Sequence, residues 1–225
     1  MTETQLVVCR GVSRTHGRGS TATVALGPTD CAVAPGERVA LVGPSGSGKS
    51  TLLYLMAGLD EPTTGEIEWP AIGDRSELRP SRVAMIFQGP SLLAPLTVVE
   101  NVALPLLLAG ADDAAATKTA HEALATLDLG ELAAKLPEEI SGGQAQRVAI
   151  ARALAGEPSL ILADEPTGQL DAVNGAAVVE VLLQASRHSG AGLVVSTHDL
   201  AVANALPGRW EIHNGELAVR ETETV

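Results

Sequence analysis

The chain has 225 residues, enough for one large domain or two small ones with a well-buried core. Hydrophobic residues make up 45% of it and aromatic residues only 2%, so we expect a core of Ala, Val, Leu and Ile. The net charge of −12 argues against general nucleic-acid binding, which needs a basic face. The two cysteines, Cys9 and Cys31, form no C-x-x-C pair and favour a reducing compartment.

Short apolar runs in the N-terminal region predict a small group of β-strands. They cover residues 5–9, 23–25 and 31–33 and are broken by Gly, Pro and Asp. Residues 14–20 are polar and predict a loop between the first two strands. A further short strand is predicted at residues 66–69.

A glycine-rich segment at residues 43–50 predicts a phosphate-binding loop. It fits the pattern G-x-x-x-x-G-K-[ST], and it lies between a predicted buried strand at 38–42 and a predicted helix at 51–58. Glycines let backbone N–H groups wrap a phosphate closely, and the helix N-terminus adds partial positive charge. Lys49 would reach the β- and γ-phosphates, and the Ser50 hydroxyl would bind Mg²⁺. An ordinary Gly/Ser turn is the alternative, and the flanking elements disfavour it. The expected nucleotide-binding residues here are Gly43, Pro44, Ser45, Gly46, Ser47, Gly48, Lys49, Ser50 and Thr51.

The middle of the chain is predicted to be a helical insertion in an α/β core. A buried strand at residues 82–87 ends at Gln88, and an Ala- and Leu-rich region punctuated by prolines follows, to about residue 140. Residues 114–127 have helical spacing, with Asp112 or Asp113 as the cap. We expect one domain over 1–225, with the core at about 1–88 and 157–225 and the helical subdomain at about 89–156. The longest apolar stretch, 102–111, is too short to span a membrane, so the chain is expected to be soluble by itself.

The second half predicts alternating helices and buried strands. A helix opens at residues 141–147, and Gly156 and Pro158 end it. Residues 173–186 predict another helix, and residues 193–195 a buried strand that leads to His198. Asn214-Gly215 predicts a hairpin between strands at 209–213 and 216–219.

Asp164 and Glu165 follow a wholly apolar strand at residues 160–163. Ligands of open α/β sheets bind at the carboxyl ends of their strands. Beside a phosphate loop, Asp164 should hold Mg²⁺ through water, and Glu165 can orient or deprotonate an attacking water. Most Asp-Glu pairs are solvated loop residues, but the strand before this one and the phosphate loop favour a catalytic site.

The order of these motifs resembles the ATP-binding subunit of ABC transporters over nearly the whole chain. The resemblance implies a P-loop NTPase α/β core with a small antiparallel β subdomain and an inserted α-helical subdomain. It also implies hydrolysis of ATP to ADP and phosphate. The motifs are the loop at 43–50, Phe87-Gln88, Ile140 to Gln144, Leu162 to Pro166, Leu170-Asp171 and Thr197 to Asp199.

The resemblance also implies the roles of individual residues. Gln88 would sense Mg²⁺ and the attacking water, and His198 would contact the γ-phosphate. A signature loop would contact ATP bound to a second subunit, which implies a head-to-tail homodimer; its residues are Ser141, Gly142, Gly143 and Gln144. Asp171 would communicate across that dimer. His16 falls where the family stacks an aromatic residue on adenine, although a solvated loop histidine is equally compatible with the sequence.

Finer resemblance points to the branch that serves lipoprotein release, macrolide export and cell division. Residues 58–66 and 98–106 carry it, and Gln169 stands where Asn is usual. It implies a four-span permease with a large extracytoplasmic domain, and a position on the cytoplasmic face of the membrane. We expect residues 91–96, flanked by Pro90 and Pro95, to form an exposed apolar groove for a permease helix, and Leu106 to Leu108 to pack inside the helical subdomain.

Two other functions are weighed against this one. A non-transport ABC ATPase that acts on nucleic acid or translation usually carries coiled-coil insertions, two cassettes or basic surfaces, and none is evident here. A P-loop kinase with an organic acceptor would not need residues 141–144.

Overall fold

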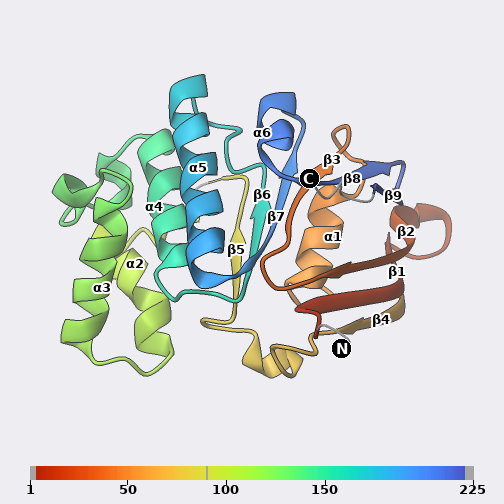
Figure 1. Ribbon diagram of the computed structural model, residues 1–225, viewed down its shortest axis with the longest axis horizontal. Helices are drawn as coiled ribbons and strands as arrows, with labels where there is room; N and C mark the ends of the chain where they lie inside the picture. The colour runs from red at the N-terminus through yellow and green to blue at the C-terminus, as the bar shows by residue number, and fades with distance from the viewer. Residues whose placement is uncertain (1–3, 90, 221–225) are drawn as a thin grey trace.

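The structure is a computed structural model that describes residues 4–89 and 91–220; of Ser20, Val219 and Arg220 it describes only the backbone. Its elements combine two β-sheets with helices (Figure 1). The strands are β1 (Val7–His16), β2 (Thr23–Val33), β3 (Arg38–Val42), β4 (Thr64–Glu68), β5 (Val83–Ile86), β6 (Leu160–Asp164), β7 (Gly192–Thr197), β8 (Gly208–His213) and β9 (Glu216–Arg220). The α-helices are α1 (Lys49–Met56), α2 (Val98–Leu108), α3 (Asp113–Ala125), α4 (Gly142–Leu154), α5 (Ala172–Ser189) and α6 (Leu200–Ala205). Short 3-10 helices are η1 (Gly19–Thr21), η2 (Arg75–Glu77), η3 (Gly130–Leu132) and η4 (Pro137–Glu139).

The larger sheet has six strands in the order β5-β6-β7-β3-β8-β9. Its pairs are parallel from β5 to β8, and β9 is antiparallel to β8. Along β6, Leu160 and Leu162 pack in one hydrophobic cluster, and Ile161 and Ala163 pack in the other. Successive side chains of a strand point to opposite faces, so both faces of the sheet are covered at β6, which explains the unbroken apolar run of that strand.

The smaller sheet has three antiparallel strands in the order β2-β1-β4. The predicted loop at 14–20 is wrong for residues 14–16, which belong to β1, and the runs at 23–25 and 31–33 belong to the single strand β2. Register shifts in β1, with Gly11 at a φ of 56° beside the first, mark bulges that let the strands continue past irregular pairing. The alternation of apolar and polar residues that predicts a strand is interrupted at these bulges, although the strands themselves continue.

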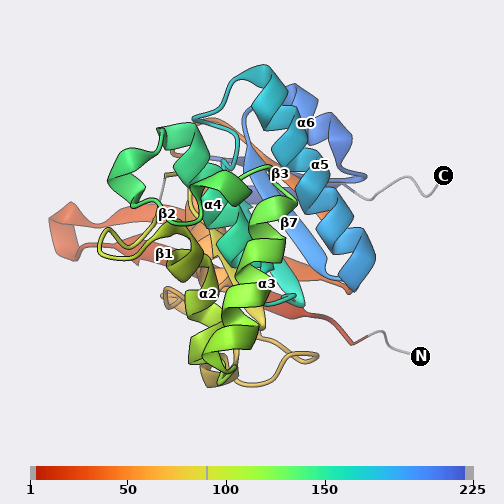
Figure 2. The ribbon, with the colours of Figure 1, turned by 90° about the vertical axis from the view of Figure 1, so that its left-hand side faces the viewer.

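Helices α2, α3 and α4 pack on one another at one end of the molecule (Figure 2). Asp112 caps α3 by accepting hydrogen bonds from the N–H groups of Ala114 and Ala115, which confirms one of the two predicted caps. The expected burial of Leu106 to Leu108 is wrong in part. Leu106 packs against the core, but Leu107 is 37% exposed and Leu108 68% exposed, because they lie in the last turn of α2. None of the described helices is both long and apolar enough to cross a membrane.

The hairpin predicted at Asn214-Gly215 is confirmed between β8 and β9. Asn214 has a φ of 51° and Gly215 a φ of 80°, the left-handed conformations that a tight two-residue turn requires. The Gly215 N–H donates to the Ser47 carbonyl oxygen at 2.9 Å. The hairpin therefore supports the glycine-rich loop directly.

Candidate functional site

The predicted phosphate loop connects β3 to α1, as its sequence pattern requires. At Gly43 a Cβ atom would lie 2.2 Å from the Ile212 carbonyl oxygen, so only glycine fits beside β8. Gly48 has a φ of 108°, and a Cβ there would lie 2.6 Å from the Ala25 carbonyl oxygen of β2. Close backbone approach therefore fixes both glycines, and the loop is held between the two sheets.

Lys49 is buried at the start of α1 and is folded back onto its own loop. Its Nζ donates to the carbonyl oxygens of Gly43 at 2.8 Å and Pro44 at 3.0 Å. The same Nζ lies 3.8 Å from Glu165 Oε1. A buried ammonium is thus held over the loop by neutral oxygens and one carboxylate, where an anionic ligand can recruit it.

Asp164 and Glu165 lie at the carboxyl end of β6, beside Ser196 at the end of β7. Asp164 is 1% exposed, and its Oδ1 accepts a hydrogen bond of 2.6 Å from Ser196 Oγ. The backbone N–H of Glu165 donates to Ser196 Oγ at 3.0 Å and to the Ser196 carbonyl oxygen at 3.1 Å. Ser196 therefore orients both acidic residues, a role that its position directly after an apolar run did not reveal.

Glu165 lies between buried Lys49 and His198, which is predicted to contact the γ-phosphate. The residue is 8% exposed and has a φ of 45°, an uncommon conformation for a residue with a side chain. Its Oε2 lies 2.8 Å from Nδ1 of His198, whose side chain is largely exposed. The carboxylate is thus held by His198 at Oε2, on its solvent side, and lies near the Lys49 ammonium at Oε1.

Tyr54 on α1 adjoins this acidic pair. Burial is the main cause that raises the pKa of the Tyr54 phenol, and the charge of Asp164 and a hydrogen bond to it act in the same direction. The Tyr54 ring also lies 6.0 Å from the ring of Phe87, centroid to centroid. Because Phe87 precedes Gln88, Tyr54 connects Asp164 and Glu165 with the segment around Gln88, called the glutamine loop below.

Gln88 is exposed, and α4 holds the chain on both sides of it. Before it, Gln146 Nε2 donates to the Phe87 carbonyl oxygen at 3.0 Å. After it, Arg152 donates to the Ser91 carbonyl oxygen at 2.8 Å and to Ser91 Oγ at 2.5 Å. Burial lowers the pKa of Arg152. Sequence reasoning missed Gln146 and Arg152, because neither falls in a short motif.

The signature residues lie at the N-terminus of α4. Ser141 caps the helix by accepting from the Gln144 N–H, and Gln144 Oε1 accepts from the Ser141 N–H at 2.8 Å. Ser141 and Gly142 are exposed, and α4 lies apart from α1, with strands of the larger sheet between them (Figure 1). Within the described residues, no hydrogen bond or ion pair joins the signature residues to the phosphate loop.

His16 is the last residue of β1 and pairs with Thr23 of β2. It is exposed, and it lies in a strand where a loop was expected. The strand that it pairs with continues to Ala25, whose carbonyl oxygen lies against Gly48. His16 therefore lies at the end of the central strand of the small sheet, and the neighbouring strand β2 approaches the phosphate loop at Ala25.

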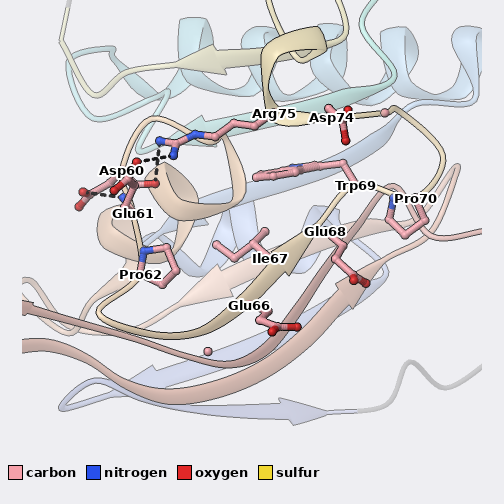
Figure 3. Close-up of a pocket in the computed structure, with 12 residues that line it drawn as sticks. Asp60, Glu61, Pro62, Glu66, Ile67, Glu68, Trp69, Pro70, Asp74 and Arg75 are labelled. Atoms are coloured by element: carbon pink, nitrogen blue, oxygen red, sulfur yellow. Dashed lines mark hydrogen bonds and ion pairs between the residues drawn. The ribbon is translucent and has the colours of Figure 1, made fainter.

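A separate cavity of about 950 Å³ lies beside β4 (Figure 3). Carboxylates and Trp69 line it, and Arg75 donates to Glu61 at 2.7 Å across its edge. None of the predicted site residues lines this cavity. The candidate site is therefore the surface between the phosphate loop, β6 and β7, not this cavity.

Comparison with known proteins identifies the family. The family described as ABC transporter matches residues 26–168. The chain is 40% identical to the lipoprotein-releasing system ATP-binding protein LolD of Xanthomonas axonopodis pv. citri (strain 306), over 95% of this chain and 91% of that protein. It is 39% identical to LolD of Legionella pneumophila (strain Paris), over 92% and 95% of the two chains.

A solved structure has the same fold. It is the ATP-binding cassette MJ0796 in a dimeric post-hydrolysis state bound to ADP and Pi, with a TM-score of 0.89 and 36% sequence identity. The match covers 97% of this chain and 99% of that one. The fold predicted from the motif order is thereby confirmed, and so is the ATPase function. The chain belongs to the ABC transporter family, as an ATP-binding subunit whose hydrolysis of ATP drives transport.

Proposed function

We propose that the phosphate loop holds the triphosphate of ATP, with Lys49 on its β- and γ-phosphates and His16 stacked on the adenine. The observation that carries this proposal is the position of Lys49, which is buried over the loop and bonded only weakly to Glu165, at 3.8 Å. A triphosphate offers Lys49 stronger charge-assisted bonds than the carbonyl oxygens of Gly43 and Pro44. Binding of ATP would therefore release Glu165 from the lysine.

The residues around this loop also fit one Mg²⁺ ion. Ser50, Gln88 and Asp164 offer oxygen donors, which Mg²⁺ prefers, and the bond from Ser196 fixes the Asp164 carboxylate in one orientation. A bound Mg²⁺ ion neutralises charge on the phosphates. Asp164 would hold the ion through water, and Ser50 would contact it directly.

Glu165 is proposed as the general base, and His198 as the residue that orients it and contacts the γ-phosphate. The contact of 2.8 Å between His198 Nδ1 and Glu165 Oε2 fixes the carboxylate beside the loop. A base so placed can accept the proton of a water that attacks the γ-phosphate. Gln88 would help to position that water, on a segment that α4 holds at Phe87 and Ser91.

The active unit is proposed to be a head-to-tail homodimer. Ser141, Gly142, Gly143 and Gln144 cap α4 away from the chain's own phosphate loop, so they are available to the ATP of a second copy. A helix N-terminus with free N–H groups favours a phosphate. The related cassette MJ0796 was solved as a dimer, which supports the same arrangement here.

The partner is proposed to be a permease of the kind that serves lipoprotein release, as the similarity to LolD suggests. We expect four membrane spans, a large extracytoplasmic domain, and a position of this subunit on the cytoplasmic face of the membrane.

A candidate docking site lies between the larger sheet and α2. This leucine groove has a volume of about 450 Å³ and is lined by Leu59, Arg79, Val83, Met85, Phe87, Leu93, Leu104, Pro105, Leu108 and Arg152, among others. Leu93 is 46% exposed, whereas Leu92 packs against the core, so only part of the expected segment 91–96 faces the groove. Pro90 lies outside the described residues. A permease helix that docks in the groove would contact Arg152, which holds the glutamine loop.

Co-purification tests this docking. The probe is a four-span permease, sought among the adjacent reading frames and co-expressed with this chain. Leu108→Glu, in the groove, is expected to abolish co-purification while the isolated variant still hydrolyses ATP. The matched control is Leu107→Glu, one position earlier on α2 and outside the groove lining, which should co-purify normally. Normal co-purification of Leu108→Glu would place the docking surface elsewhere.

A further inference from the structure

Cys9 and Cys31 are direct partners across the small sheet. Cys9 on β1 pairs with Cys31 on β2, next to the pairs Val8–Ala32 and Val7–Val33. Directly opposite residues in antiparallel strands point to the same face. Both thiols therefore face the hydrophobic cluster beneath this sheet, where Cys9 is only 2% exposed and Cys31 is half-buried. Both are free cysteines, and they are the only two in the chain.

The spacing of the two residues suits a covalent bond. Opposite residues on antiparallel strands have Cβ atoms about 4.5–5.5 Å apart. A disulfide needs about 3.5–4.5 Å between Cβ atoms, so a small local adjustment suffices. A hydrogen bond between the two thiols is the largest cause that raises the pKa of Cys31, and burial, Cys9, Asp30 and Glu37 act in the same direction. The Cys31 thiolate is therefore scarce at neutral pH, so its attack on an external disulfide is expected to be slow.

We propose that this pair is a modification site, which a small disulfide converts into a cross-strand disulfide between β1 and β2. The Cys31 thiolate attacks one sulfur of the small disulfide, and that molecule's other half leaves as a thiolate. The Cys9 thiolate then attacks Cys31 Sγ and releases the second half. Two S–H bonds are lost, one S–S bond forms within the chain, and the small disulfide is reduced to two thiols.

The two cysteines have different parts in this reaction because they differ in exposure. Cys31 is the more exposed of the two residues, so an external disulfide would meet it first, whereas Cys9 is 2% exposed and can meet only Cys31. The new bond would close the segment 9–31, which contains His16. Oxidation would therefore act on the small sheet beside the phosphate loop, at a distance from the acidic residues at the ends of β6 and β7.

Intact-mass measurement after treatment of the folded protein with glutathione disulfide tests the proposal. The wild-type chain should lose the mass of two hydrogen atoms and show no free thiol after unfolding. Cys9→Ala should instead keep one glutathione on Cys31, because no second thiol can release it. Cys31→Ser should keep its unmodified mass, because Cys9 is enclosed.

Cys9→Ser is a second variant in case the alanine leaves a destabilising cavity. A wild-type chain that keeps both thiols, accumulates a lasting glutathione adduct, or forms disulfide-linked dimers would overturn the proposal. An unmodified Cys9 variant would overturn it as well, since Cys31 would then not be the entry point.

Discussion

At the scale of single residues, the site is organised by side chains that lie just outside the recognised motifs. Ser196 fixes Asp164 and Glu165 together, and Tyr54 lies near Phe87 and has its pKa raised by burial and by Asp164. Each of these residues acts across strands or helices that are distant in sequence. A short motif records only neighbours along the chain, so it cannot reveal them.

Tyr54 offers a direct spectroscopic report on the acidic pair, because it is the only tyrosine in the chain. Burial and Asp164 raise its pKa, so the folded protein should ionise its phenol at higher pH than the unfolded chain does. The fold favours the neutral Tyr54 phenol. This contribution to the free energy of unfolding is present below the pKa of Tyr54 in the unfolded chain, and it is lost as pH rises through the pKa in the folded protein. Ultraviolet titration of phenolate absorbance measures the shift. Asp164→Asn should reduce the pKa shift of Tyr54 in part. An unchanged titration curve in this variant would mean that Asp164 does not contribute to the shift.

His16 provides a prediction on the adenine side. His16→Ala should weaken ATP binding by about 1 kcal/mol if the imidazole stacks on the base, and His16→Tyr should restore or improve it. Isothermal titration with ATP measures both affinities. Equal affinities in all three proteins would place the adenine away from β1.

At the scale of elements, α4 links the signature residues at its start with the glutamine loop along its length. Ser141 caps the helix, Gln146 holds Phe87, and Arg152 holds Ser91. Because a helix moves as a unit, displacement of the loop by a permease would be transmitted to the signature residues through α4.

Arg152→Met tests this link, since it keeps the apolar stem and removes the hydrogen bonds to Ser91. We expect kcat for ATP hydrolysis to fall about tenfold while KM changes little, because the loop positions the attacking water more than the nucleotide. Arg187→Met, at an exposed site on α5, is the control and should behave as wild type. A rise in KM with unchanged kcat would contradict the positioning role.

The cap of α3 gives a stability prediction that is separate from the site. Asp112→Ala removes the acceptor for two backbone N–H groups and should lower the free energy of unfolding by about 1 kcal/mol. Denaturant unfolding measures this change. We expect ATP hydrolysis to be unaffected. Asp113→Ala removes a neighbouring carboxylate that is not the cap. It should lower the free energy of unfolding by less than Asp112→Ala does. Equal losses in the two variants would mean that charge, not capping, stabilises the helix.

At the scale of the whole molecule, the sequence predicted the α/β core well because its strongest signals are local. The phosphate loop, the apolar strand before Asp164 and the Asn214-Gly215 turn each depend on a few adjacent residues. The small sheet was predicted poorly, because the bulges of β1 break the local pattern while cross-strand pairing continues. Burial of Leu107 and Leu108 was also mispredicted, since composition does not show which helix face meets a groove. The boundaries of the helical subdomain stay a prediction.

The central claim is that Glu165 acts as the base in a dimer that closes on ATP. The Glu165→Gln variant tests it most directly. Phosphate release measures its ATP hydrolysis, and light scattering measures its molar mass with and without ATP. The amide keeps the shape but cannot accept the proton, so turnover should fall about 10²–10⁴-fold and an ATP-dependent dimer should persist. Near-normal turnover, or a monomer at saturating ATP, would contradict the account.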